Sequence, residues 1–109
     1  RWARSQYATA TPLCVGYSFG AHVLWHALAL LSGHKAMLIA PPSAAMDFAA
    51  RENELDTAIH AVWCQGDDFV NPARFTKDTR ISVTELAGGD HFFSRQTEGL
   101  ADAVASMIA

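Results

Sequence analysis

The sequence lacks the features that mark several large classes of protein. No apolar run reaches the ~18 residues that a membrane-spanning helix needs, and no stretch resembles a secretory signal peptide. The net charge of −3 provides no basic surface for nucleic acid or for an anionic membrane. The two cysteines, Cys14 and Cys64, each lie in an apolar run, which predicts reduced core residues rather than a disulfide framework. We therefore expect a cytoplasmic protein with no nucleic-acid or membrane partner.

The start of the chain lacks an initiator methionine. Residues 1–7 have the composition of the last turns of a helix, with no N-cap residue before them. We interpret this as a chain that begins in mid-helix and expect residues 1–109 to be a partial domain of a longer protein. The length itself suits one small domain, and no internal repeat or second domain is visible.

Short apolar runs alternate with helical patterns along the whole sequence. The runs cover residues 12–15, 35–40, 60–65 and 81–86, and helices are expected at 19–31, 73–78 and 94–108, with helical propensity also at 44–50. The run 19–31 is apolar nearly all round and predicts a buried helix that ends at a left-handed Gly33. Alternation of this kind predicts an α/β fold, a parallel sheet of about four strands with helices on both faces.

A glycine-flanked serine joins the first run to the first long helix. Residues 16–20 read Gly-Tyr-Ser-Phe-Gly. A strand, a sharp turn and a helix in this arrangement lift the hydroxyl of Ser18 clear of the backbone. Gly16 and Gly20 fit the turn, because a Cβ at either position is expected to collide with the crossing strand and helix.

Reactive side chains follow the other strands as well. Asp67 and Asp68 come after the third apolar run, and His91 comes after the fourth. Because the carboxyl ends of parallel strands meet at one edge of the sheet, we expect a serine, an aspartate and a histidine to converge there. A serine hydroxyl is a poor nucleophile without a base, and an imidazole with a pKa of about 6.5 can accept and return its proton. The backbone N–H of Phe19 is placed to bind the resulting oxyanion.

Four stretches together identify a family resemblance: residues 16–21, Ala-Pro-Pro at 40–42, residues 65–72 and Gly-Asp-His-Phe-Phe at 89–93. They resemble the α/β-hydrolase superfamily, and most of all its small, lidless bacterial members related to dienelactone hydrolase and to serine-aminopeptidase-like proteins. The resemblance covers the second half of that fold. It implies Ser18 as nucleophile, His91 as base, an aspartate after the third strand as the orienting acid, and no cofactor or metal.

The sequence departs from the family pattern in three ways. The family places two residues between the loop glycine and the catalytic aspartate, and the spacing here is one residue short. Counting on from Gly66 favours Asp67, whereas counting back from residues 70–72 favours Asp68, and we favour Asp68. The loop that supplies the family's second oxyanion donor is missing, and so are the early strands that flank the serine strand. The run 12–15 is therefore expected to be an unpaired edge, beside an exposed apolar patch on the first helix.

Other residues are weaker candidates. Tyr17, Pro41, Phe92 and Phe93 are candidates for the lining of an apolar substrate pocket, together with Phe19 and Phe48, and core packing is the alternative. His22 and His26 lie one helical turn apart, but no third metal ligand is evident, so we interpret them as ordinary helix residues. Asp90 is expected to shape its loop.

Two functions follow as hypotheses. The first is a serine hydrolase of carboxylic esters, or of amides or thioesters, that acts on a small acyl substrate through an acyl-enzyme. The second is a catalytically impaired hydrolase fragment that associates through its exposed sheet edge and forms a homo-oligomer.

Overall fold

The computed structural model describes residues 12–31, 33–49 and 57–108 of the chain. Strands and helices alternate in the order β1 (Leu13–Tyr17), α2 (Phe19–Ala27), the 3₁₀ helix η1 (Leu28–Leu30), β2 (Lys35–Ile39), β3 (Ala58–Cys64), α3 (Ala73–Thr76), β4 (Ile81–Leu86) and α4 (Thr97–Ile108). The strands form one four-stranded sheet in the order β1-β2-β3-β4, and every pair is parallel. The expected fold class is confirmed.

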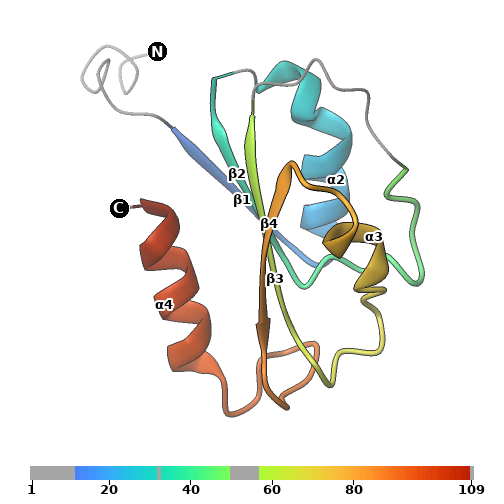
Figure 1. The fold of residues 1–109 in the computed structure, drawn as a ribbon, viewed down its shortest axis with the longest axis vertical. Coiled ribbons are helices and arrows are strands. Elements are labelled where there is room, and N and C mark those ends of the chain that lie inside the picture. Colours follow the sequence, from blue (N-terminus) through green and yellow to red (C-terminus); the bar gives the residue numbers. More distant parts are fainter. Residues whose placement is uncertain (1–11, 32, 50–56, 109) are drawn as a thin grey trace.

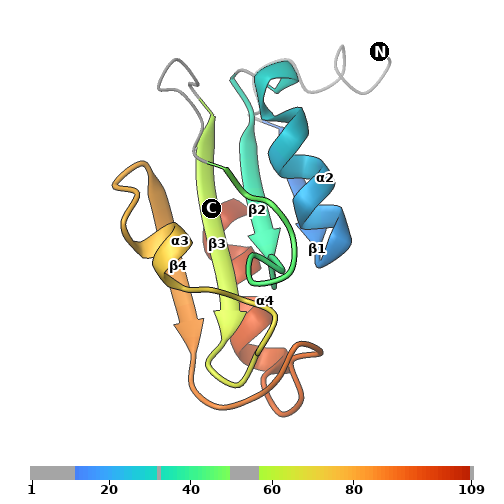
Figure 2. The same ribbon diagram turned by 90° about the vertical axis from the view of Figure 1, so that its right-hand side faces the viewer.

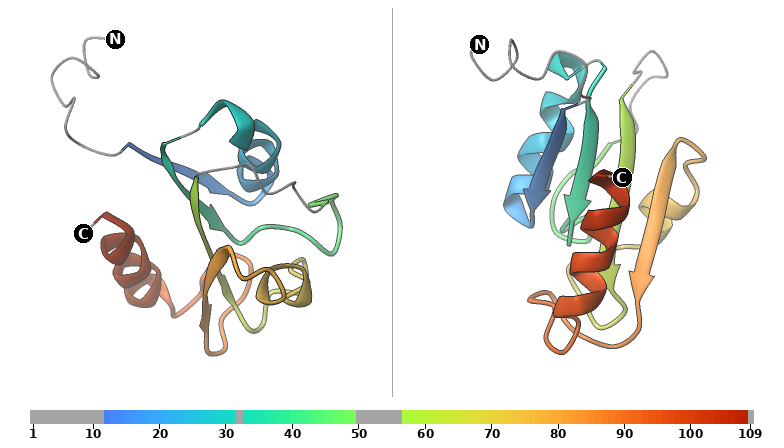
Figure 3. Two further views of the ribbon diagram at one scale, coloured as in Figure 1. Left: turned by 45° about the horizontal axis from the view of Figure 1, so that its top comes forward. Right: turned by 90° about the vertical axis from the view of Figure 1, so that its left-hand side faces the viewer.

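Helices cover both faces of the sheet (Figure 1). α2 and α3 lie on one face and α4 lies on the other, which the end-on view also shows (Figure 3). Successive residues of the central strands face opposite layers, so Leu38 and Trp63 pack with α2 and α3 while Met37 and Val62 pack with α4. Both central strands are therefore continuously apolar, as a strand buried on two faces requires.

The parallel register brings the ends of all four strands to one edge (Figure 2). Tyr17 lies opposite Ile39, Ile39 opposite Val62, and Val62 opposite Thr84. The turns that carry the candidate site residues leave the sheet at this edge.

The described part of residues 44–50 is not a helix. Ala45 and Met46 donate backbone hydrogen bonds to the Pro42 carbonyl, at 3.1 and 2.9 Å, and the chain then runs on without helical structure to Ala49. Phe48 is buried between Trp25 and Phe75, with ring centroids 5.8 and 5.7 Å away. Packing of this one aromatic ring outweighs the helical propensity of the neighbouring alanines.

Two helices differ from the expected ranges at one end. α4 begins at Thr97 rather than Ser94, because Phe93 and Arg95 have φ angles of 58° and 63°, outside the helical region. On α4, Ala103 is buried, whereas Ile108 is exposed. α3 begins at Ala73, as expected, but ends at Thr76 rather than at residue 78.

The exposed apolar side of the molecule lies at β1 and α2. The helix ends at Ala27 and continues as η1, and Gly33 has the expected left-handed φ of 80°. Val15 and Phe19 are 50% and 60% exposed, and Leu30 is 85% exposed. The expectation that the helix of residues 19–31 is buried is therefore wrong for this chain, whereas the expected apolar patch beside an edge strand is present. Among the described residues no helix is long and apolar enough to cross a membrane. The helix expected at residues 1–7 lies outside the described residues.

Candidate active site

Ser18 occupies the sharp turn between β1 and α2. Its backbone has φ 55° and ψ −118°, a conformation that costs energy for any residue with a Cβ. The backbone N–H of Ser18 donates to the Ile39 carbonyl at 2.8 Å, and its carbonyl accepts from Ala21 and His22 at 2.9 and 3.3 Å. The neighbouring strand and the first turn of α2 thus hold the strained serine in place.

The two glycines of the motif differ in their surroundings. A Cβ on Gly16 would lie 2.4 Å from the Gly20 carbonyl oxygen, so only glycine lets α2 cross the strand this closely. A Cβ on Gly20 would meet no atom of the described residues within 4 Å. The expected collision therefore exists at Gly16, and the expectation was wrong for Gly20, which lies on the exposed side of α2.

The three expected chain segments meet through two short hydrogen bonds. The Ser18 Oγ lies 2.7 Å from His91 Nε2, and His91 Nδ1 lies 2.8 Å from Asp67 Oδ2. The Asp67 carboxylate is fully buried and the imidazole is 12% exposed. An aspartate on Nδ1 holds the tautomer whose Nε2 can accept a proton from the serine.

The aspartate that contacts His91 is Asp67 and not Asp68, the residue we favoured from the sequence. Asp68 is exposed. The shortened loop turns at once after β3, because the Asp67 N–H donates to the Cys64 carbonyl at 3.0 Å. The other Asp67 oxygen, Oδ1, accepts from the Phe69 N–H at 2.9 Å.

The loops that follow β3 and β4 are tied together beneath this pair. Gln65 and Gly66 donate backbone hydrogen bonds to the Leu86 and Gly88 carbonyls, at 2.8 and 3.1 Å. A Cβ on Gly66 would lie 2.1 Å from the Gly89 carbonyl oxygen. Glycines at both positions let the two loops approach closely enough for Asp67 to reach His91, a requirement that sequence reasoning missed.

The His91 loop is shaped by Asp90, as expected. The Asp90 carboxylate accepts from the Ser94 hydroxyl at 2.7 Å and from the backbone N–H groups of Phe92 and Ser94 at 2.9 and 3.1 Å. These bonds, that of the Ser94 hydroxyl above all, lower the pKa of Asp90 below its ordinary value. The carboxylate therefore stays ionised and keeps the loop closed.

Tyr17, at the end of β1, also holds the loop that carries His91. Its hydroxyl donates to the His91 carbonyl oxygen at 2.8 Å. Burial raises the pKa of Tyr17, and the negative charges of Asp67 and Asp90 raise it further. The phenol therefore remains protonated and able to donate this bond.

Aromatic side chains surround the imidazole of His91. The rings of Phe69, Phe92 and Tyr17 lie 4.9, 5.6 and 5.7 Å from it, and Phe92 is 77% exposed. Tyr17, Phe92 and Phe19 are thus accessible beside the candidate site. Phe69 was missed, although it directly follows the two aspartates.

Three of the expected pocket residues are core residues instead. Pro41, Phe48 and Phe93 are all buried, and Phe93 packs with Met37 and Cys64 beneath α4. Phe93 turns inward because its positive φ reverses the chain after His91. Phe48 and Phe93 belong to the two core clusters on opposite faces of the sheet.

The first backbone N–H groups of α2 directly follow Ser18 in the chain and have no partner within the helix. The first intrahelical bonds run from Ala21 and His22 to the Ser18 carbonyl, so the N–H groups of Phe19 and Gly20 remain outside the helical pattern. The Phe19 N–H, which has no intrahelical partner, and the positive end of the helix dipole are suited to an oxyanion on a group bound at Ser18.

The two histidines of α2 contact each other. Their Nε2 atoms lie 3.1 Å apart, and that of His26 lies 3.2 Å from the Asp47 carbonyl oxygen. The described ranges contain no group of three or more His, Cys, Asp or Glu side chains arranged to hold a metal ion.

No protein-family model and no curated protein matches the chain. Several solved structures do match the chain. A lidless α/β serine hydrolase from Xanthomonas campestris matches with a TM-score of 0.77 at 26% identity, over 98% of this chain and 50% of that chain. An α/β serine hydrolase homologue from Coxiella burnetii matches with a TM-score of 0.74 at 20% identity, over the full length of this chain and 54% of that chain.

The chain therefore spans about half the length of the hydrolases that it matches. Its parallel sheet and flanking helices are half of an α/β-hydrolase fold, as the resemblance in the sequence implied.

Proposed function

We propose that the chain carries the nucleophile, base and acid of a serine hydrolase that cleaves carboxylic esters, with amides and thioesters as related substrates. The observation that carries the proposal is the continuous series of hydrogen bonds from Ser18 Oγ through His91 to Asp67, at 2.7 and 2.8 Å. The similarity to solved serine hydrolases supports the same reaction class.

The acylation step uses each of these groups once. Ser18 Oγ attacks the carbonyl carbon of the ester while its proton passes to His91 Nε2. The carbonyl oxygen becomes an oxyanion and accepts a hydrogen bond from the Phe19 N–H. When the tetrahedral intermediate collapses, the C–O bond to the alcohol breaks and His91 returns the proton to the departing oxygen.

Deacylation repeats these steps with water as the nucleophile. His91 accepts a proton from the water as its oxygen attacks the acyl carbon, and the carboxylic acid leaves as Ser18 regains its proton. The Asp67 carboxylate stabilises the imidazolium formed in both steps. No cofactor is required.

A fluorophosphonate probe tests the proposal, because it forms a covalent bond with an activated serine only. We expect labelling of the wild-type chain at Ser18 and none of Ser18→Ala. Peptide mass spectrometry locates the label. Labelling that persists in Ser18→Ala would contradict the assignment of the nucleophile.

A second candidate rests on the exposed side of β1 and α2. Val15, Phe19 and Val23 are all at least half exposed, and β1 pairs only with β2 among the described residues. In this candidate the chain associates with a second copy through β1 and has weak activity, since one oxyanion donor instead of two costs on the order of 100-fold or more in rate. A wild-type chain that takes up no probe would favour it.

A further inference from the structure

Two histidines on α2 have no part in the reaction proposed above. His22 and His26 lie one helical turn apart, and their side chains contact each other through Nε2 atoms that are 3.1 Å apart. His26 is exposed and His22 is half-buried. Four-residue spacing on a helix is the arrangement in which two histidines can reach the same metal ion. The contact between them therefore needs an explanation of its own.

The two imidazoles have the geometry of a pair of metal ligands. Nitrogens that bind one ion at ~2.0–2.1 Å, at octahedral or tetrahedral angles, are about 2.9–3.4 Å apart, and the centres of their rings are about 4.5–5.2 Å apart. Here the Nε2 atoms are 3.1 Å apart and the ring centres are 4.6 Å apart. Rings that pointed straight at each other across the same gap would have centres about 5.4 Å apart. The rings are therefore tilted off the line between the two nitrogens, as two rings that share an ion are.

A backbone oxygen from the loop after β2 lies beside the pair. The Asp47 carbonyl oxygen is 3.2 Å from His26 Nε2, which is again the separation of two donor atoms on one ion. The sequence could not reveal this donor, because every residue has a carbonyl and Asp47 lies 21 residues from His26. The described ranges bring no third His, Cys, Asp or Glu side chain into such a group. The donor set is thus two nitrogens and one oxygen, which leaves positions for water.

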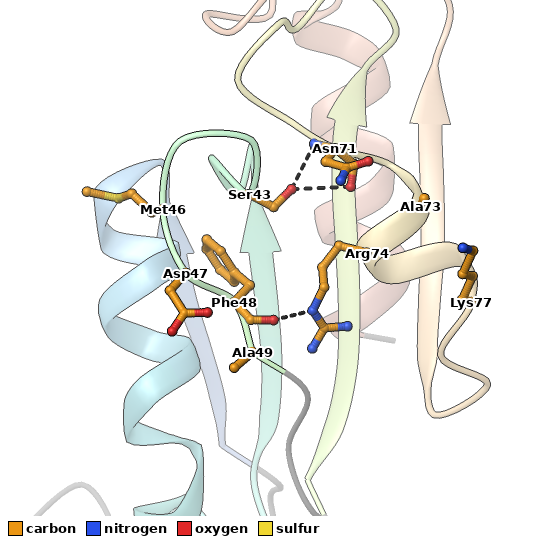
Figure 4. A pocket seen from close by; sticks show the side chains of 9 residues that line it. All are labelled: Ser43, Met46, Asp47, Phe48, Ala49, Asn71, Ala73, Arg74 and Lys77. Carbon is orange, nitrogen blue, oxygen red and sulfur yellow. Dashed lines mark hydrogen bonds between the residues drawn. The ribbon is translucent and has the colours of Figure 1, made fainter.

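The segment that carries the Asp47 carbonyl is docked on α2. The Trp25 Nε1–H donates to the Ala49 carbonyl at 3.1 Å, and the Phe48 ring lies 5.4 Å from the imidazole of His22. Figure 4 shows this segment running alongside α2, with Asp47 next to the helix. The three donor atoms are therefore already held together, so binding of an ion requires little further ordering of the chain.

We propose that His22 Nε2, His26 Nε2 and the Asp47 carbonyl oxygen bind one divalent transition-metal ion. Imidazole is a preferred ligand of Zn²⁺, Cu²⁺ and Ni²⁺, whereas Mg²⁺ and Ca²⁺ prefer oxygen ligands. The ion joins α2 to the loop after β2. Because the three donors come together only in the folded chain, the bound ion stabilises the fold. This site is independent of the serine chemistry proposed above.

Isothermal titration calorimetry of the whole chain with Zn²⁺ tests the proposal. We expect one ion per chain with a Kd on the order of 10 μM, and no saturable binding of Mg²⁺. Zn²⁺ at about 100 times its Kd should raise the Tm by about 10 °C. A chain that does not bind Zn²⁺, or that binds Mg²⁺ as tightly, would overturn the proposal.

Variants locate the ion. His22→Gln and His26→Gln should each weaken Zn²⁺ binding at least about tenfold and remove most of the Tm shift, because an amide is a poor ligand for this ion. At position 26 glutamine keeps a side-chain N–H for the Asp47 carbonyl, and that position is exposed, so the variant keeps the fold. His34→Gln makes the same change away from the pair and should leave binding unchanged.

A further variant separates this site from the candidate active site. His91→Gln should bind Zn²⁺ as the wild type does, and circular dichroism verifies that each variant is folded. Zn²⁺ binding that survives His26→Gln, or that is lost in a folded His91→Gln variant, would contradict the proposed site.

Discussion

At the scale of single residues, the imidazole of His91 depends on contacts from three different chain segments. Asp67 bonds to its Nδ1, Ser18 lies against its Nε2, and the Tyr17 hydroxyl holds its backbone carbonyl. Each contact is 2.7 or 2.8 Å long, so a small displacement of any of the three partners changes the position of the imidazole.

The neighbouring aspartates offer a matched pair of variants. Asp67→Asn should lower the rate of fluorophosphonate labelling by up to about 10⁴-fold, because an amide no longer selects the tautomer with a basic Nε2. Asp68→Asn removes the same charge at an exposed position and should change the rate by less than about threefold. Time courses of labelling give both rates.

A reversal of this order would show that Asp68 is the orienting acid. Equal, small effects of both variants would mean that the hydrogen bond between Asp67 and His91 contributes nothing to the reactivity of Ser18.

At the scale of elements, the crossing of β1 and α2 determines how the serine is presented. The crossing is close because Gly16 has no side chain, and a Cβ there would overlap the Gly20 carbonyl oxygen at 2.4 Å. Gly20 itself lies in open space. The two glycines of the motif therefore have different roles in one turn.

Gly16→Ala should lower the free energy of unfolding by about 1–3 kcal/mol, because either the helix or the strand must move to admit the methyl group. Gly20→Ala should leave the stability unchanged or raise it by up to about 1 kcal/mol, since alanine is the better helix former. Urea denaturation followed by circular dichroism measures both changes. A Gly16→Ala variant as stable as the wild type would show that α2 does not need this close approach.

The sequence was sufficient to predict the elements that local patterns determine. The runs that became β2, β3 and β4 are short, apolar and bounded by turn residues, and β4 begins and ends where expected. The expected helix at 44–50 was wrong because Phe48 packs between Trp25 and Phe75, which are distant in the sequence. The expected start of α4 was wrong because Phe93 and Arg95 adopt positive φ angles. No local pattern carries that information.

The same limit applies to the site. Ser18 and His91 follow from the topology alone, since both leave the sheet at the same edge. The choice between Asp67 and Asp68 depends on a turn that is one residue shorter than usual, and the sequence gives two counts that disagree. In the structure the Asp67 N–H donates to the Cys64 carbonyl at 3.0 Å, and Asp67 is the aspartate whose carboxylate reaches His91.

At the scale of the whole molecule, the exposed edge of the sheet has the largest consequence for behaviour in solution. An unpaired, apolar strand edge is a template for pairing with another chain. We propose that copies of the chain associate through β1, where Val15 is 50% exposed.

Val15→Lys tests this association, because a charged side chain on an edge strand opposes pairing. Light scattering should give a mass above that of the 11.8 kDa monomer for the wild type and the monomer mass for the variant. Ile108→Lys, a matched change at an exposed residue of α4, should associate as the wild type does. A compact wild-type monomer would contradict the idea.

The strand order also determines when the site is completed as the chain is made. Because spatial order follows chain order from β1 to β4, each strand can join its predecessor as soon as it leaves the ribosome. Asp67 and His91 are 24 residues apart, but Ser18 waits 73 residues for its base. In the proposed mechanism Ser18 therefore gains its reactivity only when the loop after β4 closes and brings His91 to it. If the proposal is correct, a fluorophosphonate label on Ser18 reports the closure of the loop after β4 as well as the reactivity of the serine.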